Sequence, residues 1–178
     1  MKAAHPWLTQ KSDWSMCALL AITSSTPAQI NSRMESIYTS LRERDFQRSD
    51  ELQAAAQILY FHDEEPQLSC ARFQTLFQAF KQSGLWRGRQ DYDEIALLCF
   101  ARQDAAVVLA SVERHRATIA ALPHLPDKQA SFDLACGTTL LELARQSRDL
   151  ERLPETQLLL NIHAILTAQQ AATRAAAS

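Results

Sequence analysis

His115 is the residue in this sequence whose position most favours a chemical role. It stands on a helical stripe of apolar residues, where an imidazole could bind a ligand, a metal ion or a proton. No Cys, His, Asp or Glu stands at a partner spacing on the same face, so we predict no metal site there. The alternative is that His115 packs its ring in the core and hydrogen-bonds a neighbour. Both hypotheses stay open: a small-ligand or substrate pocket near His115, or a structural histidine.

Arginine supplies most of the positive charge of the chain, with 14 of the 18 basic residues, and many of these lie near the expected ends of helices or in turns. A strip of such residues could follow a phosphate backbone. Interleaved acidic residues and a net charge of −2 argue against nucleic acid. Basic side chains near helix C-termini also stabilise the helix without any ligand. We name Arg48, Arg87 and Arg89 as candidate binding residues in these turns.

Trp86 lies in an expected turn between Gly84 and Gly88, where a large apolar ring has few reasons to lie unless something covers it. The cover is either the next pair of helices or a binding partner. Tyr92 follows shortly after, and either ring could stack against a base or pack against a peptide. Both residues are therefore candidates for a binding surface.

Two acidic clusters could hold a cation, one at residues 63–65 beside His62 and one formed by Asp91, Asp93 and Glu94. They lack the glycine and the alternating ligands of a calcium loop. Because helix N-termini favour acidic residues, we interpret both clusters as solvated capping charge. The sequence also lacks the common phosphate-binding, nucleophile and zinc motifs, so we expect no catalytic residue, no metal and no cofactor.

The elements that position these residues recur with a period of about 39 residues. Large apolar residues of the first helix in each pair fall at Leu19, Leu20 and Ile22, at Ile58, Leu59 and Phe61, and at Leu97, Leu98 and Phe100. The turn before each second helix recurs as Thr26-Pro27, Glu65-Pro66 and Asp104-Ala105. One helix pair cannot bury both its apolar stripes alone, whereas stacked pairs can. We therefore predict an all-α fold: an α-solenoid-like stack of antiparallel helix pairs, HEAT-like in form.

About eight helices are expected. They begin near Asp13, Pro27, Ser49, Pro66 or Ser69, Asp91, Asp104, Lys128 and Pro154. Gly84 is a natural end for the fourth helix. No Gly-rich or Ser-rich linker divides the 178 residues, so we predict a single domain over residues 1–178, with a frayed tail at 171–178.

The four cysteines have neither a zinc-site spacing nor the density of a disulfide framework. We expect Cys17, Cys99 and Cys136 to be buried free thiols. No window approaches 18 apolar residues, and the N-terminus lacks a continuous apolar core. We therefore expect a cytoplasmic protein with no membrane span and no signal peptide.

Three short stretches resemble a known family. They are residues 5–9 (HPWLT), residues 18–21 (ALLA) and the segment from Ile37-Tyr38 to Leu52-Gln53. This part of the chain, about the first 100 residues, is similar to DUF4003, an uncharacterised bacterial family of helical proteins. The resemblance implies an all-helical fold. Since the family has no assigned activity and no catalytic motif, it implies nothing about function.

A small stack of helix pairs usually binds something. We therefore predict a protein- or peptide-binding helical-repeat module whose partner is an unknown protein or peptide. Two alternatives stay open: a small-ligand binder or enzyme with a pocket near His115, and phosphate or nucleic-acid binding through the arginine-rich turns. An uncapped terminal repeat could also pair with its own copy and give a homodimer.

Overall fold

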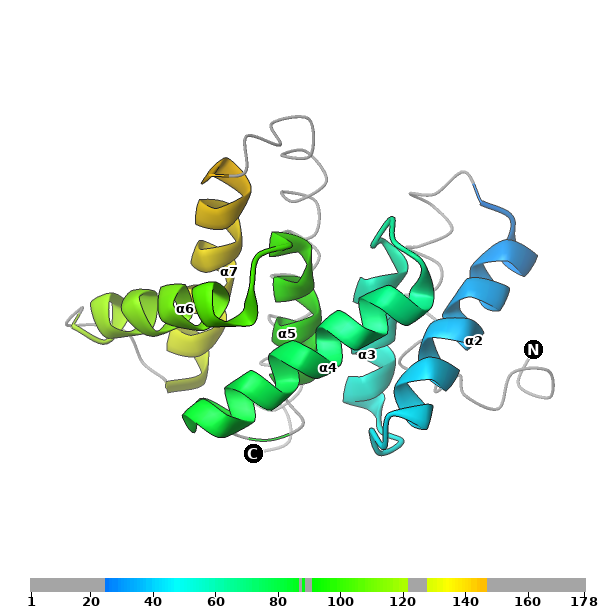
Figure 1. Ribbon diagram of the computed structural model, residues 1–178, viewed down its shortest axis with the longest axis horizontal. Helices are drawn as coiled ribbons and strands as arrows, with labels where there is room; N and C mark the ends of the chain where they lie inside the picture. Colours follow the sequence, from blue (N-terminus) through cyan, green and yellow to red (C-terminus); the bar gives the residue numbers. More distant parts are fainter. Residues whose placement is uncertain (1–24, 87, 89–90, 122–127, 147–178) are drawn as a thin grey trace, which may run out of the picture. The chain divides into compact units, whose positions relative to one another are not determined.

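A computed structural model describes residues 25–86, 88, 91–121 and 128–146 of the chain. Within this part, the chain forms six α-helices, a short 3-10 helix and no β-strand (Figure 1). The elements are α2 (Pro27–Glu43), α3 (Asp50–Tyr60), α4 (Pro66–Ser83), α5 (Tyr92–Leu98), η2 (Cys99–Ala101), α6 (Ala105–Ala120) and α7 (Lys128–Gln146). The all-α prediction is confirmed for these residues. The helices expected near Asp13 and Pro154, and the tail at 171–178, lie outside them.

The chain divides into two compact units, one up to Cys99 and one from Phe100 onwards. The first unit contains α2 to α5, and the second contains α6 and α7. The single domain expected over residues 1–178 stays a prediction.

Helix α3 is the central element of the first unit, since it packs against α2, α4 and α5. Its sequence suits this position, because the small residues Ala55 and Ala56 are fully buried and let neighbouring helices approach closely. Leu52 and Leu59 are fully buried as well. Most positions of α3 are therefore covered, unlike the single apolar stripe of a surface helix. In Figure 1, α2 and α3 run in opposite directions, and α4 lies across α3 and α5.

The starts of three helices follow the spacing seen in the sequence. Helices α2, α4 and α6 begin at Pro27, Pro66 and Ala105, which are 39 residues apart in each step. Each follows an N-cap residue with extended backbone: Thr26, Glu65 and Asp104. Thr26 forms the expected capping box with Gln29. Of the two starts considered for the fourth helix, the chain uses Pro66.

The ends of α2 and α4 each require a left-handed residue. After α2 that residue is Asp45, with φ of 65°, and after α4 it is Gly84, with φ of 76°. Around Asp45, the amide of Phe46 donates to the carbonyl oxygen of Leu41 at 3.3 Å, and the amide of Asp45 donates to that of Arg42 at 3.1 Å. This pair of bonds is a Schellman motif, which turns the chain sharply back on the helix. The expected helix end at Gly84 is confirmed.

The turn between α3 and α4 is held by polar contacts. The guanidinium of Arg33 donates to the carbonyl oxygens of His62 and Glu64. The His62 ring is buried, with Nε2 at 3.3 Å from the carbonyl oxygen of Cys99 and Nδ1 at 3.0 Å from Ser69 Oγ. Because a carbonyl oxygen only accepts, Nε2 donates and Nδ1 accepts from the hydroxyl. His62 therefore joins the end of α3 to α4 and to the end of α5.

The second unit is built on the packing of α6 against α7. Its buried side chains include Val108, Val112 and Ile119 of α6 and Phe132, Cys136, Leu140 and Leu143 of α7. The four from α7 are the apolar stripe expected for that helix, at a spacing of three or four residues.

The cysteines of the described residues are free and buried, namely Cys70, Cys99 and Cys136. This confirms the expectation for Cys99 and Cys136, whereas Cys17 lies outside the described residues. Burial raises the pKa of the Cys70 thiol to about 11, which keeps it protonated and unreactive near neutral pH.

The left-handed backbone at Asp45 leads to a stability prediction. An L-residue in this region carries a steric cost that glycine avoids, so Asp45→Gly should raise the free energy of unfolding by about 0.5 kcal/mol. Urea denaturation followed by circular dichroism measures the change. Glu43→Gly, two residues earlier at the last position of α2, is the matched control and should lower the free energy by up to about 1 kcal/mol. A loss of stability in Asp45→Gly would contradict the turn described here.

Candidate functional site

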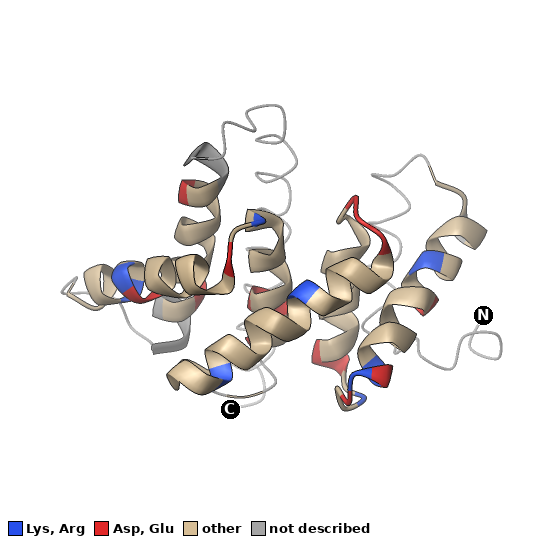
Figure 2. Ribbon diagram, viewed as in Figure 1, with Lys and Arg blue, Asp and Glu red and all other residues tan. Residues whose placement is uncertain are grey.

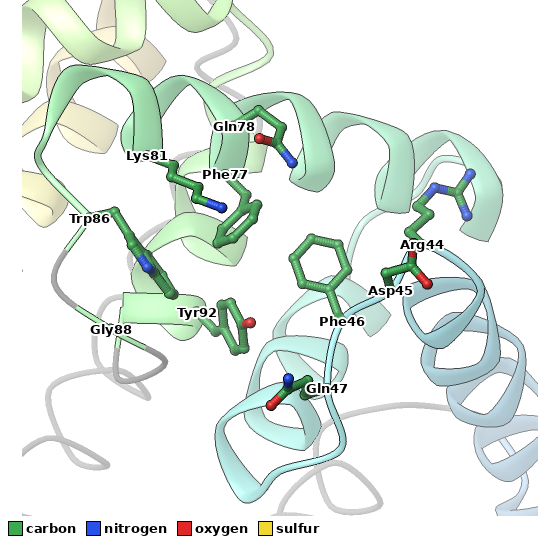
Figure 3. Close-up of a pocket in the computed structure, with 10 residues that line it drawn as sticks. All are labelled: Arg44, Asp45, Phe46, Gln47, Phe77, Gln78, Lys81, Trp86, Gly88 and Tyr92. Carbon is green, nitrogen blue, oxygen red and sulfur yellow. The ribbon is translucent and has the colours of Figure 1, made fainter.

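A cavity of about 440 Å³ opens in the first unit, where the ends of α2 and α4 meet the start of α5 (Figure 3). It is lined by the turn after α2, by the last part of α4, and by Trp86, Gly88 and Tyr92. The lining residues are Arg44, Asp45, Phe46, Gln47, Phe77, Gln78, Lys81, Trp86, Gly88 and Tyr92. Two of the residues predicted from the sequence, Trp86 and Tyr92, are therefore brought together at one site.

Aromatic side chains form the inner wall of the cavity. We use the name aromatic cluster for Phe46, Phe73, Phe77, Trp86 and Tyr92, whose rings are in mutual contact. Ring centroids lie 4.9 Å apart for Phe77 and Trp86, 5.2 Å for Trp86 and Tyr92, and 5.0 Å for Phe46 and Phe77. Most of these pairs are edge-to-face, the arrangement that the ring quadrupoles favour.

The members of the aromatic cluster differ in how far they reach solvent. Phe73 is fully buried, and Phe46 and Tyr92 are only 4% and 5% exposed. Phe77 and Trp86 are partly exposed, so these two rings supply the apolar surface that a ligand would contact. The ring of Tyr92 packs against both of them and is almost fully buried. It is therefore not available to stack on a base, although the sequence had suggested this role for it.

The local fold explains why these rings converge. Phe73 and Phe77 are one turn apart on α4 and share a face with Lys81. The Schellman turn at Asp45 directs Phe46 towards the same face. After Gly84, the amide of Trp86 donates to the carbonyl oxygen of Phe80 at 3.1 Å, which folds the chain back along α4.

Polar side chains surround the aromatic wall. In Figure 3, Lys81 and Gln78 lie beside Phe77, while Arg44 and Asp45 lie on the far side of Phe46. Arg44 donates to the carbonyl oxygens of Ser40 and Gln67, at 2.9 and 3.3 Å. No acceptor in the described part of the chain contacts the exposed Lys81 ammonium. The rim therefore offers one uncommitted cation close to exposed aromatic surface.

Of the three arginines predicted as binding residues, the structure describes one. Arg48 is exposed in the loop between α2 and α3, next in the chain to the lining residue Gln47. Arg87 and Arg89 lie outside the described residues. Several other guanidinium groups are engaged within the protein; that of Arg42, for example, donates to the carbonyl oxygen of Phe46 at 2.6 Å. Phosphate binding through these turns stays a prediction.

His115 lies in the second unit and is hydrogen-bonded to Glu142 of α7. Its Nε2 atom is 2.9 Å from Glu142 Oε2, which also accepts from Ser111 Oγ at 2.6 Å and from Arg114. These hydrogen bonds and the positive charge of Arg114 lower the pKa of the Glu142 carboxyl below its ordinary value. The carboxylate stands between the serine and the histidine, whereas in a catalytic triad the histidine takes the central place. The arrangement is that of a polar link between α6 and α7.

The interpretation of Asp91, Asp93 and Glu94 as solvated capping charge is wrong. Their exposed fractions are 0%, 8% and 2%. The reason is that every residue of α5 is buried where it packs against α3 and α4, so its acidic first turn is buried too. Glu64 in the other acidic turn lies 3.5 Å from Arg72 and from the ring of His62.

Neither a metal site nor a membrane helix stands out in the described residues. No group of three or more His, Cys, Asp and Glu side chains there is arranged to hold a metal ion. None of the helices described is by itself long and apolar enough to cross a membrane; α5 with η2, taken together with α6, reaches the necessary length and composition only as a bent pair.

Sequence reasoning missed Phe46, Lys81 and Gln78 at the cavity and Glu142 beside His115. Gln78 and Lys81 carry a weak signal, because they lie in the last part of α4, a few residues before Trp86, and Lys81 follows Phe77 by one turn. Phe46 carries none, because it follows α2, about 40 residues earlier in the chain. Glu142 carries none: it comes from a different helix, and residue spacing along one helix cannot identify a partner on another.

The link at Glu142 leads to a prediction of pH dependence. Because the native pKa of Glu142 is lowered, its ionised form stabilises the fold above the unfolded-state pKa, and this contribution is lost as the pH falls through the native pKa. Glu142→Gln should lower the free energy of unfolding by about 0.5–1 kcal/mol at pH 7, with a smaller difference in acid. Urea titrations of both proteins across this range measure it. Glu113→Gln, at an exposed position of α6, is the control and should be neutral; an equal effect would contradict the link.

Comparisons with known proteins identify a family whose function is unknown. Searches of curated proteins and of solved structures find no match to this chain. A family model does match, over residues 1–171, and so extends well past the first 100 residues that carry the resemblance in the sequence. The chain belongs to DUF4003, a family described as proteins of unknown function.

Proposed function

We propose that this protein is a peptide-binding helical-repeat module whose site is the cavity over the aromatic cluster. One observation carries the proposal: Phe77 and Trp86 are partly exposed at the mouth of a cavity of about 440 Å³, with polar side chains around them. Large aromatic side chains surrounded by a polar rim are typical of surfaces that bind other proteins. The volume suits a few side chains of a peptide better than a whole folded domain.

The polar residues of the rim suit an extended peptide. Gln47 and Gln78 stand at different places around the cavity, and each amide group can both donate and accept a hydrogen bond. A peptide backbone presents donors and acceptors in alternation, so such side chains can bind it with little dependence on sequence. The aromatic wall then selects the side chains.

The proposal includes a HEAT-like stack with a period of about 39 residues. Three features support it. The starts of α2, α4 and α6 are 39 residues apart, as are the left-handed residues Asp45 and Gly84. In the first unit, helices in equivalent places of successive pairs also pack together, α2 with α4 and α3 with α5. Stacked pairs of this kind bind ligands along their helix layers and turns.

The proposed location is the cytoplasm, and the proposed partner is a peptide segment of another protein. The free thiols at Cys70, Cys99 and Cys136 support a reducing compartment, because secreted proteins of this size commonly oxidise their cysteines. Pairing with a second copy through a terminal repeat remains part of the proposal and does not involve the cavity.

A peptide-display selection tests the function. The full chain is immobilised, a random peptide library is selected on it, and the affinity of enriched peptides is measured by fluorescence polarisation. Since a central aromatic residue can contribute most of the binding energy, Trp86→Ala should weaken binding by about 30-fold or more. Leu68→Ala is the matched control, because Leu68 is an apolar residue of α4 that is 61% exposed and lies outside the cavity lining; it should leave the affinity unchanged.

Folding must be separated from binding in this test. Thermal melts of each variant show whether the first unit is intact, and Trp86→Phe keeps an aromatic ring while changing its shape. The proposal predicts an intermediate loss of affinity for Trp86→Phe. It is contradicted if no peptide is enriched, or if folded Trp86→Ala binds the enriched peptides as tightly as the natural sequence.

A further inference from the structure

We infer that the preferred peptide carries an Asp or Glu close to an apolar anchor residue, and that Lys81 selects this carboxylate. The inference rests on the proposed function, because it concerns the chemistry of the ligand at the same cavity. The proposed occupant is an acidic peptide segment. The charges around the cavity, and their distance from the aromatic wall, support this ligand.

Lys81 is the uncommitted charge of the rim. It is exposed and makes no ion pair with any described residue, whereas Arg44 already donates to the carbonyl oxygens of Ser40 and Gln67. Helix α4 contains Arg72 and Lys81 but no acidic residue, as Figure 2 shows by two blue segments and no red one. Of these two cations, Arg72 faces Glu64. An acidic ligand would therefore provide Lys81 with a partner that its own helix does not supply.

Among the described residues that line the cavity, one carries a carboxylate, and it does not cancel this charge. Asp45 lies beside Arg44 and is separated from Lys81 by Phe46 and Phe77 in Figure 3. No ion pair joins Asp45 to Lys81, although both are among the described residues. In the sequence, residues 81–89 (KQSGLWRGR) contain three basic residues and no acidic one. Of these three basic residues, Lys81 is the one that the structure describes and places in the cavity lining.

The position of Lys81 also sets the spacing within the ligand. It follows Phe77 by one helical turn, so the ammonium and the exposed ring are neighbours on one face of α4. In an extended peptide, alternate side chains on the same side are about 7 Å apart. An apolar residue on the aromatic wall thus places a carboxylate two positions away, on the same side of the peptide, within reach of Lys81.

A cationic anchor is the main competing chemistry, because aromatic faces attract ammonium and guanidinium groups. Here it is disfavoured, since a cation at the aromatic wall would lie close to the Lys81 ammonium with no carboxylate between them. The same unpaired charge favours the acidic ligand. Phosphate groups of a nucleic acid are also negatively charged, so the experiment must distinguish an acidic peptide from a nucleic acid.

Charge exchange between protein and peptide tests the inference. The selected peptides should be enriched in Asp or Glu two positions away from an aromatic or aliphatic residue. Lys81→Glu should weaken their binding by about tenfold, and Lys81→Met by about threefold. A peptide whose acid is replaced by Lys should bind Lys81→Glu better than it binds the natural sequence. Raising the salt concentration should reduce binding of the acidic peptides to the natural sequence. Arg72→Met, on the same helix but outside the cavity lining, is the matched control for loss of a charge.

Three results would overturn the inference, and each says something different. In the first, peptides bind through Trp86 but are not enriched in acidic residues, and Lys81→Glu does not change their affinity. This result would leave the proposed function intact and reject only the preference for an acidic ligand. In the second, no peptide binds through Trp86, which would reject both the proposed function and the preference for an acidic ligand. Binding of a labelled single-stranded oligonucleotide that Lys81→Glu abolishes, without binding of acidic peptides, would assign the cavity to nucleic acid.

Discussion

The contact of aromatic rings from three separate segments is the interaction on which the first unit most visibly depends. Phe46 follows α2, Phe73 and Phe77 belong to α4, and Trp86 and Tyr92 lie before and at the start of α5. No single helix could bury these rings alone. Their packing therefore ties the end of one helix pair to the next pair, in the way that neighbouring units of a repeat protein support each other.

The same cluster explains why a binding site would lie here. A folded protein buries most of its large aromatic side chains, yet Phe77 and Trp86 remain partly exposed at the open side of the cluster. The buried members hold these rings in one orientation, since Phe46 and Tyr92 are almost fully covered. A ligand would meet a surface that is already ordered, which lowers the entropic cost of binding.

Much of the fold follows from local sequence signals, and much of the site does not. Thr26 and Pro27 predict the start of α2, and Gly84 predicts the end of α4, because caps act through backbone groups close by. The burial of Asp91, Asp93 and Glu94 was not predictable in this way, because it depends on α5 being covered by helices far away in the sequence. The pairing of His115 with Glu142 was not predictable for the same reason, because the two residues belong to different helices. Trp86 was found from its odd place between two glycines, but the rings that support it required the three-dimensional structure.

Fluorine NMR of the full chain labelled with 5-fluorotryptophan would show most directly whether a peptide binds over the aromatic cluster. The protein contains three tryptophans, Trp7, Trp14 and Trp86, so the spectrum has few signals and Trp86→Phe assigns the relevant one. On titration with an enriched peptide, the resonance of Trp86 should shift in proportion to the fraction bound, while the other two move little. If the peptide binds and the Trp86 resonance stays unchanged, the aromatic cluster is a structural core and the binding surface lies elsewhere.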